Sequence, residues 1–446
     1  IGYTLDANST GLTADTSSTF NITAAAADHV TFVQQPTNTV AGVTIAPAVT
    51  VEIRDAFDNV VNSTATVNLT IGTNPGGGTL SGTVSVAAVA GVATFNTLSI
   101  DAAGVGYTLD ANSTGLTADT SSAFNITAAA ADHVTFVQQP TNTVAGATIT
   151  PAVTVEIRDA FDNVVNSSAT VNLAIGINPG GGTLSGTVSV AAVAGVATFN
   201  TLSIDNTGIG YTLDASSTGL TGDTSDAFNI IVGTPSQIAF NVQPTNTTAG
   251  ASITPSVTVE VRDAFNNLVT TDNGTLITLA IGTNPGSGIL SGTAAQPTVN
   301  GVATFPGLSI DKAGIGYTLV AAAGGYSNVI STAFTITAAA ADHLAFLQQP
   351  TNTTAGATIT PAVTVQILDA FDNVVNSGAN ITLAIGSNPS GGTLSGTTTQ
   401  AAVAGLAVFN NLSINNVATG YTLVASSAGL RNETSTPFNI VAGAPS

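Results

Sequence analysis

The chain has 446 residues, of which 43% are hydrophobic, 5% aromatic and only 7% charged. It contains no Cys, Met or Trp and only three His, which excludes disulfide scaffolds, thiol catalysis, haem or iron–sulfur ligation by Cys, and zinc fingers. Five Lys and Arg against 25 Asp and Glu give a formal net charge of −20, so no basic patch is present to bind nucleic acid.

The first residues resemble the end of an internal repeat. The string IGYTLDANSTGLTADTSSTFNI at residues 1–22 returns almost letter for letter from Val105. We therefore expect residues 1–27 to be the C-terminal hairpin of a preceding repeat, in a segment of a longer or processed protein. No apolar run approaches the roughly 18 residues of a membrane helix, so we expect no membrane insertion in this segment.

One long repeat organises the rest of the chain. Phe32, Phe136, Phe240 and Phe346 stand in nearly the same context, at spacings of 104, 104 and 106 residues. A solenoid unit has about 20–50 residues, so this longer period suits one small domain per repeat. The expected domains are repeat 1 at 28–131, repeat 2 at 132–235, repeat 3 at 236–341 and repeat 4 at 342–446.

Repeat 2 shows the strand pattern. Val153, Val155 and Ile157 alternate with polar residues, which is typical of a half-buried strand. No segment has a helical period, and Val, Ile and Thr dominate throughout. The expected strands cover 133–138, 153–158, 171–175, 183–192, 195–204, 211–215 and 227–231.

The fifth of these strands changes phase. Ala197 and Phe199 alternate in one phase and Leu202 and Ile204 in the other, which predicts a bulge near Asn200 and Thr201. Seven short strands in about 100 residues, with turns every 8 to 12 residues, are typical of an immunoglobulin-like sandwich. The sequence therefore predicts an all-β tandem array of immunoglobulin-like seven-stranded β-sandwich domains without disulfides.

Aromatic residues recur at fixed positions. All 17 Phe fall on four positions, which in repeat 2 are Phe136, Phe161, Phe199 and Phe228, and five of the six Tyr fall on the position of Tyr211. Large apolar residues at a fixed register are expected in the core. Each of these Tyr opens the sixth strand two residues before an inward Leu, so we expect tyrosine corners in sandwiches that lack a disulfide.

Four motifs recur in the same order in the repeats. In repeat 2 they are AGATITPAVTVEIRDAFDN at 145–163, TLSGT at 183–187, GVATFNTLSI at 195–204 and GYTL at 210–213. With these motifs the chain resembles the bacterial immunoglobulin-like repeats of invasin/intimin-type adhesins and other large surface proteins. The resemblance implies an extracellular spacer or adhesive stalk at a cell surface, and it names no ligand.

Residues suited to catalysis are few and repeated. His29, His133 and His343 share one register, and repeat 3 has Gln237 there, so a structural role is expected. Asp55 and Asp58 lie three apart in one turn, and such turns recur in other repeats, which does not suit a glycosidase pair. The sequence therefore predicts no enzymatic activity and no catalytic cofactor.

Calcium at the junctions between repeats is the one metal hypothesis. The carboxylates expected to gather where repeat 1 meets repeat 2 are Asp101, Asp132, Asp159, Asp162 and Asp223. Ca²⁺ takes about six to eight oxygen ligands, often from loop carboxylates. The alternative is that these residues only form Asx-turns, in which Asp and Asn are interchangeable, as Asn266 and Asn415 indicate in other repeats.

Asn-x-Ser/Thr sequons are abundant. The candidates for glycosylation are Asn62, Asn112, Asn166, Asn246 and Asn352. A host that glycosylates would attach sugars there, and the alternative is that many sequons arise by chance in a chain rich in Asn, Ser and Thr.

These features favour a mechanical function. Short linkers such as 127–131 predict a semi-rigid, non-catalytic stalk at the cell surface, whose partners are neighbouring repeats or copies and a surface ligand of unknown kind. One alternative is a self-assembling extracellular filament or sheath, in which another chain completes the sandwich of residues 1–22 by strand addition. A second alternative is the spacer of a glycan-binding or hydrolytic secreted protein.

Overall fold

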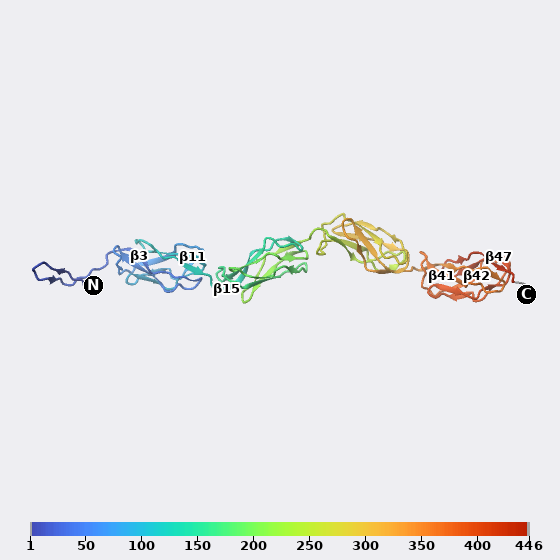
Figure 1. The fold of residues 1–446 in the computed structure, drawn as a ribbon, viewed down its shortest axis with the longest axis horizontal. Helices are drawn as coiled ribbons and strands as arrows, with labels where there is room; N and C mark the ends of the chain where they lie inside the picture. Colours follow the sequence, from blue (N-terminus) through green and yellow to red (C-terminus); the bar gives the residue numbers. More distant parts are fainter. Residues whose placement is uncertain (1, 444–446) are drawn as a thin grey trace. The chain divides into compact units, whose positions relative to one another are not determined.

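The computed structural model describes residues 2–443. Within this range, strands are the only regular secondary structure (Figure 1). A search of the described residues for a helical segment that could span a bilayer finds none. The many Val, Ile and Thr residues explain this preference, because branched side chains pack well on a pleated sheet.

Repeat 2 forms two facing layers of strands. The first layer consists of β15 (Ala131–Gln138), β17 (Val153–Asp159) and β21 (Val196–Phe199), paired antiparallel in that order. The second contains, in spatial order, β20 (Ser189–Ala191), β18 (Thr170–Ile175), β24 (Leu213–Ser217) and β25 (Asp223–Thr224). Next to it lie β16 (Thr143–Val144), β26 (Phe228–Ile231) and β23 (Gly208–Tyr211), while β19 (Leu184–Ser185) pairs with β22 (Ser203–Ile204).

The other repeats have the same order of strands. In repeat 1 the strands are β3 (Ala27–Gln34), β4 (Thr39–Val40), β5 (Val49–Asp55), β6 (Thr66–Ile71), β7 (Leu80–Ser81), β8 (Ser85–Ala87), β9 (Val92–Phe95), β10 (Ser99–Ile100), β11 (Gly104–Tyr107), β12 (Leu109–Asn112), β13 (Asp119–Thr120) and β14 (Phe124–Thr127). In repeat 3 they are β27 (Gln237–Val242), β28 (Thr247–Thr248), β29 (Val257–Arg262), β30 (Leu276–Ile281), β31 (Leu290–Ser291), β32 (Ala295–Pro297), β33 (Val302–Phe305), β34 (Ser309–Ile310), β35 (Gly314–Tyr317), β36 (Leu319–Ala323), β37 (Val329–Ile330) and β38 (Phe334–Thr337). In repeat 4 they are β39 (Ala341–Gln348), β40 (Thr353–Thr354), β41 (Val363–Asp369), β42 (Asn380–Ile385), β43 (Leu394–Ser395), β44 (Thr399–Ala401), β45 (Leu406–Phe409), β46 (Ser413–Ile414), β47 (Ala418–Tyr421), β48 (Leu423–Ser426), β49 (Glu433–Thr434) and β50 (Phe438–Val441).

The predicted class, a tandem array of immunoglobulin-like β-sandwiches, is confirmed. The predicted fourth strand is divided into β19 and β20, and the fifth into β21 and β22. The break in the fifth strand lies where the phase changes, at residues 200–202. The chain exchanges partners there, since β21 pairs with β17 and β22 pairs with β19.

Each repeat has its own hydrophobic core. The four clusters of buried residues run from Val30 to Ile126, from Val134 to Ile230, from Ile238 to Ile336 and from Leu344 to Ile440. The chain divides into two compact units, Ile1–Ile231 and Val232–Ser446, each with two of these cores. The predicted residue boundaries of the repeats stay a prediction.

The tyrosine corners are present in all four cores. Tyr211 is fully buried, and its hydroxyl donates to the carbonyl oxygen of Asn206 at 2.9 Å. The equivalent Tyr107, Tyr317 and Tyr421 donate to carbonyl oxygens five residues upstream in the same way. This bond lets a phenol lie in an apolar core without an unsatisfied hydroxyl.

One group of phenylalanines was wrongly expected in the core. Phe161 in the DAF turn is 47% exposed and Phe57 is 79% exposed, whereas Phe136 and Phe199 are buried. The reason is local: Asp159 at the end of β17 turns inward, and the turn that follows carries Phe161 away from the sandwich. Recurrence at a fixed register therefore does not distinguish a core residue from a surface residue.

Residues 3–20 form an isolated hairpin. β1 (Asp6–Ala7) pairs antiparallel with β2 (Asp15–Thr16), and Tyr3 bridges to Phe20. Tyr3 is 54% exposed, although the equivalent Tyr107 in repeat 1 is fully buried.

Candidate functional site

Asp159, one of the predicted calcium ligands, is a buried carboxylate whose oxygens are held by the protein. Oδ1 accepts the N–H groups of Phe161 and Asn163, each at 2.9 Å, and Oδ2 accepts that of Ala129 at 2.7 Å. The side-chain amide of Asn163 donates to both oxygens. Burial acts to raise the pKa of Asp159, but these hydrogen bonds outweigh it and lower the pKa below its ordinary value.

Asp132 and Asp162 flank the histidine of repeat 2. His133 Nδ1 lies 3.2 Å from Asp132 Oδ2, and His133 Nε2 lies 3.2 Å from Asp162 Oδ1. Repeat 3 has Ser236, Gln237 and Asn266 at these three positions. The three residues differ together, which indicates that they form one structural unit.

Asp101 and Asp223 accept backbone N–H groups at separate places, Asp101 in a loop of repeat 1 and Asp223 in β25 of repeat 2. Asp101 Oδ1 accepts the N–H of Thr79 at 2.7 Å. Asp223 Oδ1 accepts the N–H of Thr224, and its Oδ2 accepts that of Phe136, both at 2.9 Å. Asp101 thus holds a loop of repeat 1, and Asp223 joins the edge strand β25 to β15 of the other layer of repeat 2.

The five predicted calcium ligands do not come together as one site. In the part of the chain that the structure describes, no group of three or more Asp, Glu, His or Cys is arranged to hold a metal ion. Their contacts are of the kind that the Asx-turn alternative expects. Calcium at the junction stays a prediction.

The five predicted glycosylation sites are all exposed. Asn246 and Asn352 use their side-chain oxygens to accept the N–H groups of Thr335 and Asn439, at 2.7 and 2.6 Å. Asn62, Asn112 and Asn166 lie in the described surface without a side-chain hydrogen bond to the protein. Glycosylation stays a prediction at all five.

A parallel strand pair that the sequence did not predict joins the early and the last strand of each sandwich. β16 runs parallel to β26, with Thr143 opposite Ile230 and Val144 opposite Ile231. The same pairing joins β4 to β14, β28 to β38 and β40 to β50. We call these four pairs the terminal clamps.

Two amide side chains extend each terminal clamp. Asn142 Oδ1 accepts the N–H of Asn229 at 2.6 Å, and Gln139 Oε1 accepts that of Asp226 at 2.9 Å. Both amides belong to the string QPTN, which stands before the short strand in all four repeats. That recurrence was a signal, but the sequence alone showed only that Pro140 ends the preceding strand.

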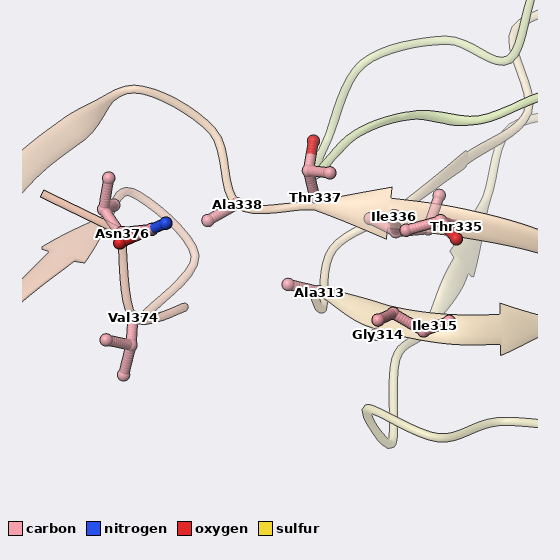
Figure 2. Close-up of a pocket in the computed structure, with 10 residues that line it drawn as sticks. Ala313, Gly314, Ile315, Thr335, Ile336, Thr337, Ala338, Val374 and Asn376 are labelled. Carbon is pink, nitrogen blue, oxygen red and sulfur yellow. The ribbon is translucent and has the colours of Figure 1, made fainter. Parts of the chain in front are cut away.

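A groove lies beside the linker between repeats 3 and 4, inside the second compact unit. Figure 2 shows Ile315 and Ala313 on one side of the Ala338 linker and Val374 on a loop of repeat 4. Its volume is about 570 Å³, and its lining residues include no Asp, Glu, His, Lys or Arg. The groove therefore offers no titratable group for general acid–base catalysis.

The comparisons with known proteins concern the fold only. No family model and no curated protein matches the chain. The chain is similar to the Escherichia coli adhesin FdeC, at 20% identity over 72% of this chain and 100% of that chain, with a TM-score of 0.29. It is also similar to domains 4–9 of the surface layer protein SbsC, at 14% identity over 93% and 66% of the two chains with a TM-score of 0.22. For the D0–D1 domain of intimin the identity is 19% over 46% and 98%, with a TM-score of 0.18. Scores this low say nothing about function, so the assignment of the fold rests on the strand order and the four cores above.

Proposed function

We propose that the chain is a tension-bearing spacer of an extracellular, cell-surface protein, a non-catalytic stalk built of immunoglobulin-like repeats. The observation that carries the proposal is the terminal clamp, which is present in every repeat. The resemblance of its motifs to bacterial surface adhesins agrees with this location. The proposal names no ligand.

The terminal clamp suits tension because its strands are parallel. When the two ends of repeat 2 are pulled apart, β16 and β26 are drawn past each other along their own axes. All the hydrogen bonds between them are then stretched at once, among them the bond from Ala145 N–H to the Ile231 carbonyl oxygen at 2.9 Å. In an antiparallel hairpin pulled at its open end, the bonds would break one after another.

Single-molecule pulling of the intact chain tests the proposal. We expect four separate unfolding events, each releasing roughly 300 Å of chain, since about 100 residues extend by up to ~3.5 Å each. The double variant Gln139→Ala, Asn142→Ala removes two hydrogen bonds of one terminal clamp, so one of the four events should move to lower force.

The matched control is Asn172→Ala, which removes a side-chain hydrogen bond to Ser189 outside the terminal clamp and should leave the four forces unchanged. Unfolding at the level of thermal noise, or an equal effect of the control, would refute the tension-bearing role.

A further inference from the structure

The turn that follows β17 is rigid by itself. Residues 159–163 close with hydrogen bonds from Asp159 N–H to the Asn163 carbonyl oxygen at 3.0 Å and from Asp162 N–H to the Asp159 carbonyl oxygen at 3.1 Å. Asp162 has a φ of 65°, in the left-handed region. We call this segment, and its equivalents 55–59 and 369–373, the docking turn.

The side-chain amide of Asn163 reaches across to repeat 1. Its Oδ1 accepts the N–H of Ala103 at 2.6 Å, and its Nδ2 donates to the carbonyl oxygen of Asp101 at 2.8 Å. The same Nδ2 is 2.9 Å from Asp159 Oδ2 inside the turn. Only an amide supplies both the acceptor oxygen and the donor N–H groups that these three contacts require. A carboxylate here would place its oxygens against the Asp159 carboxylate and the Asp101 carbonyl oxygen, with no hydrogen to donate.

The junction between repeats 3 and 4 repeats this arrangement. Asn373 Oδ1 accepts the N–H of Ala313, and Asn373 Nδ2 donates to the carbonyl oxygen of Asp311, both at 2.8 Å. Lys312 adds a hydrogen bond from its ammonium group to the carbonyl oxygen of Phe371.

At each of these two junctions, a phenylalanine ring of the docking turn also contacts the preceding repeat. A Cβ atom added to Gly42 of repeat 1 would collide with the ring of Phe161, and one added to Gly250 would collide with the ring of Phe371. Glycine at these positions therefore leaves the space in which the ring of the following repeat lies. Phe161 and Phe371 are 47% and 37% exposed, which fits rings partly covered by a neighbouring repeat.

Repeat 1 provides a comparison within the chain. Its docking turn has the same internal bonds, from the Asn59 amide to both oxygens of Asp55 at 3.2 and 3.1 Å. Only the hairpin and linker precede it in the described chain, and Asn59 makes no hydrogen bond to them within residues 2–443. Phe57 is correspondingly 79% exposed.

We propose that the docking turn is an interaction surface whose partner is the far end of the preceding repeat, with Asn163 and Asn373 as the residues that fix the orientation between neighbours. The Phe ring and the amide bind two separate features of that end, a glycine turn and the backbone of the loop before the tyrosine strand. Because the two contacts lie at separate places, neither repeat can rotate about one contact without breaking the other. This inference deepens the proposed stalk function, but it concerns orientation and not resistance to force.

Distance measurements by pulsed electron paramagnetic resonance test the docking turn. Because the chain has no Cys, spin labels on Thr70→Cys and Thr198→Cys are the only labels, and they report on repeats 1 and 2. We expect a narrow distance distribution in the otherwise unchanged chain. Asn163→Ala and Gly42→Ala should each broaden it, by roughly twofold, since neighbouring domains without a firm interface move freely.

Two controls separate docking from folding. Asn59→Ala removes the same bonds within the docking turn of repeat 1, where the Asn59 side chain makes no hydrogen bond to another repeat in the described residues, so it should leave the distribution narrow. Gly356→Ala places Ala at a similar φ, +77° against +74° at Gly42, with no atom within 4 Å, and its unfolding midpoint gives the cost of backbone strain alone. If Asn163→Ala unfolds repeat 2, the distance distribution of Gly42→Ala still tests docking, because that substitution lies in repeat 1 and disturbs the contact with the Phe161 ring.

A distribution that is already broad without either substitution, or that stays narrow in both Asn163→Ala and Gly42→Ala, would overturn the proposal. The tension-bearing role would survive that result, because its test measures force on single repeats. Conversely, a low unfolding force with a narrow distribution would refute the tension-bearing role and leave the proposal for the docking turn intact.

Discussion

At the scale of single residues, the buried aspartate at the end of the second strand organises each sandwich. Asp55, Asp159, Asp263 and Asp369 each accept a backbone N–H from the linker 30 residues earlier and hydrogen bonds from the turn that follows. One carboxylate thus ties the entrance of a repeat to its first turn. In all four the pKa is lowered.

These aspartates predict how stability depends on pH. Burial raises the pKa of Asp55, but hydrogen bonds from Ala25, Asn59 and Phe57 bring it from 3.8 down to about 2. A lowered pKa means that the stabilisation is complete above 3.8 and is lost as the pH falls towards 2. Denaturant midpoints measured from pH 6 to about 2 should stay level and then fall in that window. A chain equally stable at both ends of the range would contradict this role.

A second prediction at this scale concerns the tyrosine corner. Tyr211→Phe removes the hydrogen bond to the Asn206 carbonyl oxygen and should destabilise repeat 2 by about 1 kcal/mol. Chemical denaturation should show about a quarter of the unfolding signal moving to lower denaturant. Tyr3→Phe is the control, since Tyr3 is 54% exposed, and it should have no effect.

At the scale of elements, the phenylalanines of the β21 strand and of the DAF turn, which the sequence could not distinguish, should contribute differently to the free energy of unfolding. Phe199→Ala removes a buried ring of β21 and should cost about 3–5 kcal/mol, whereas Phe57→Ala removes an exposed ring and should stay within about 0.5 kcal/mol of the unchanged chain. Unfolding midpoints of the two variants check this. Equal losses would restore the interpretation that the DAF phenylalanines are core residues.

Local patterns predicted the long strands but not their partners. The alternation of Val153, Val155 and Ile157 was enough to locate β17, because half of its side chains face the core. β16 has two residues, too few to show alternation, and the amide that extends its clamp lies 87 residues from its partner. Pairing over such a separation leaves no local trace in a single sequence.

The candidate site was predicted only in part for the same reason. The DAFDN string was correctly interpreted as a turn, and the Asp and Asn residues of that turn make the hydrogen bonds that such turns use. That Asn163 also binds the loop of the preceding repeat depends on how two sandwiches meet, 60 residues apart in sequence. The recurrence of the string indicated that every repeat uses this turn, but it did not show that the turn contacts the preceding repeat.

At the scale of the whole molecule, aspartates carry most of the negative charge, since the chain has 21 Asp and 4 Glu against five Lys and Arg. Three of the four glutamates, Glu52, Glu156 and Glu260, are each paired with an arginine two residues on, at 2.8, 2.8 and 2.6 Å. Most of the aspartates lie in turns or near the ends of strands, where they accept backbone N–H groups.

Whether calcium binds these carboxylates can be tested on the intact chain. If calcium binds the junction carboxylates as the sequence predicts, a chelator should lower the melting midpoint of the chain, since ligand that binds only the folded state stabilises it. A melting scan with and without chelator, at constant ionic strength, measures this. An unchanged midpoint would contradict the calcium prediction.

The claim that the terminal clamps carry tension is tested most directly by pulling one repeat in two directions. Because no native Cys competes, cysteine handles at Ala130 and Ile231 pull repeat 2 from its two ends, so that the force reaches the pair of β16 and β26 through β15. Handles at Ala174 and Ser189 peel the antiparallel pair β18 and β20 apart. We predict a clearly higher rupture force along the first direction, in which parallel strands slide past each other. An equal or lower force between Ala130 and Ile231 would contradict the account.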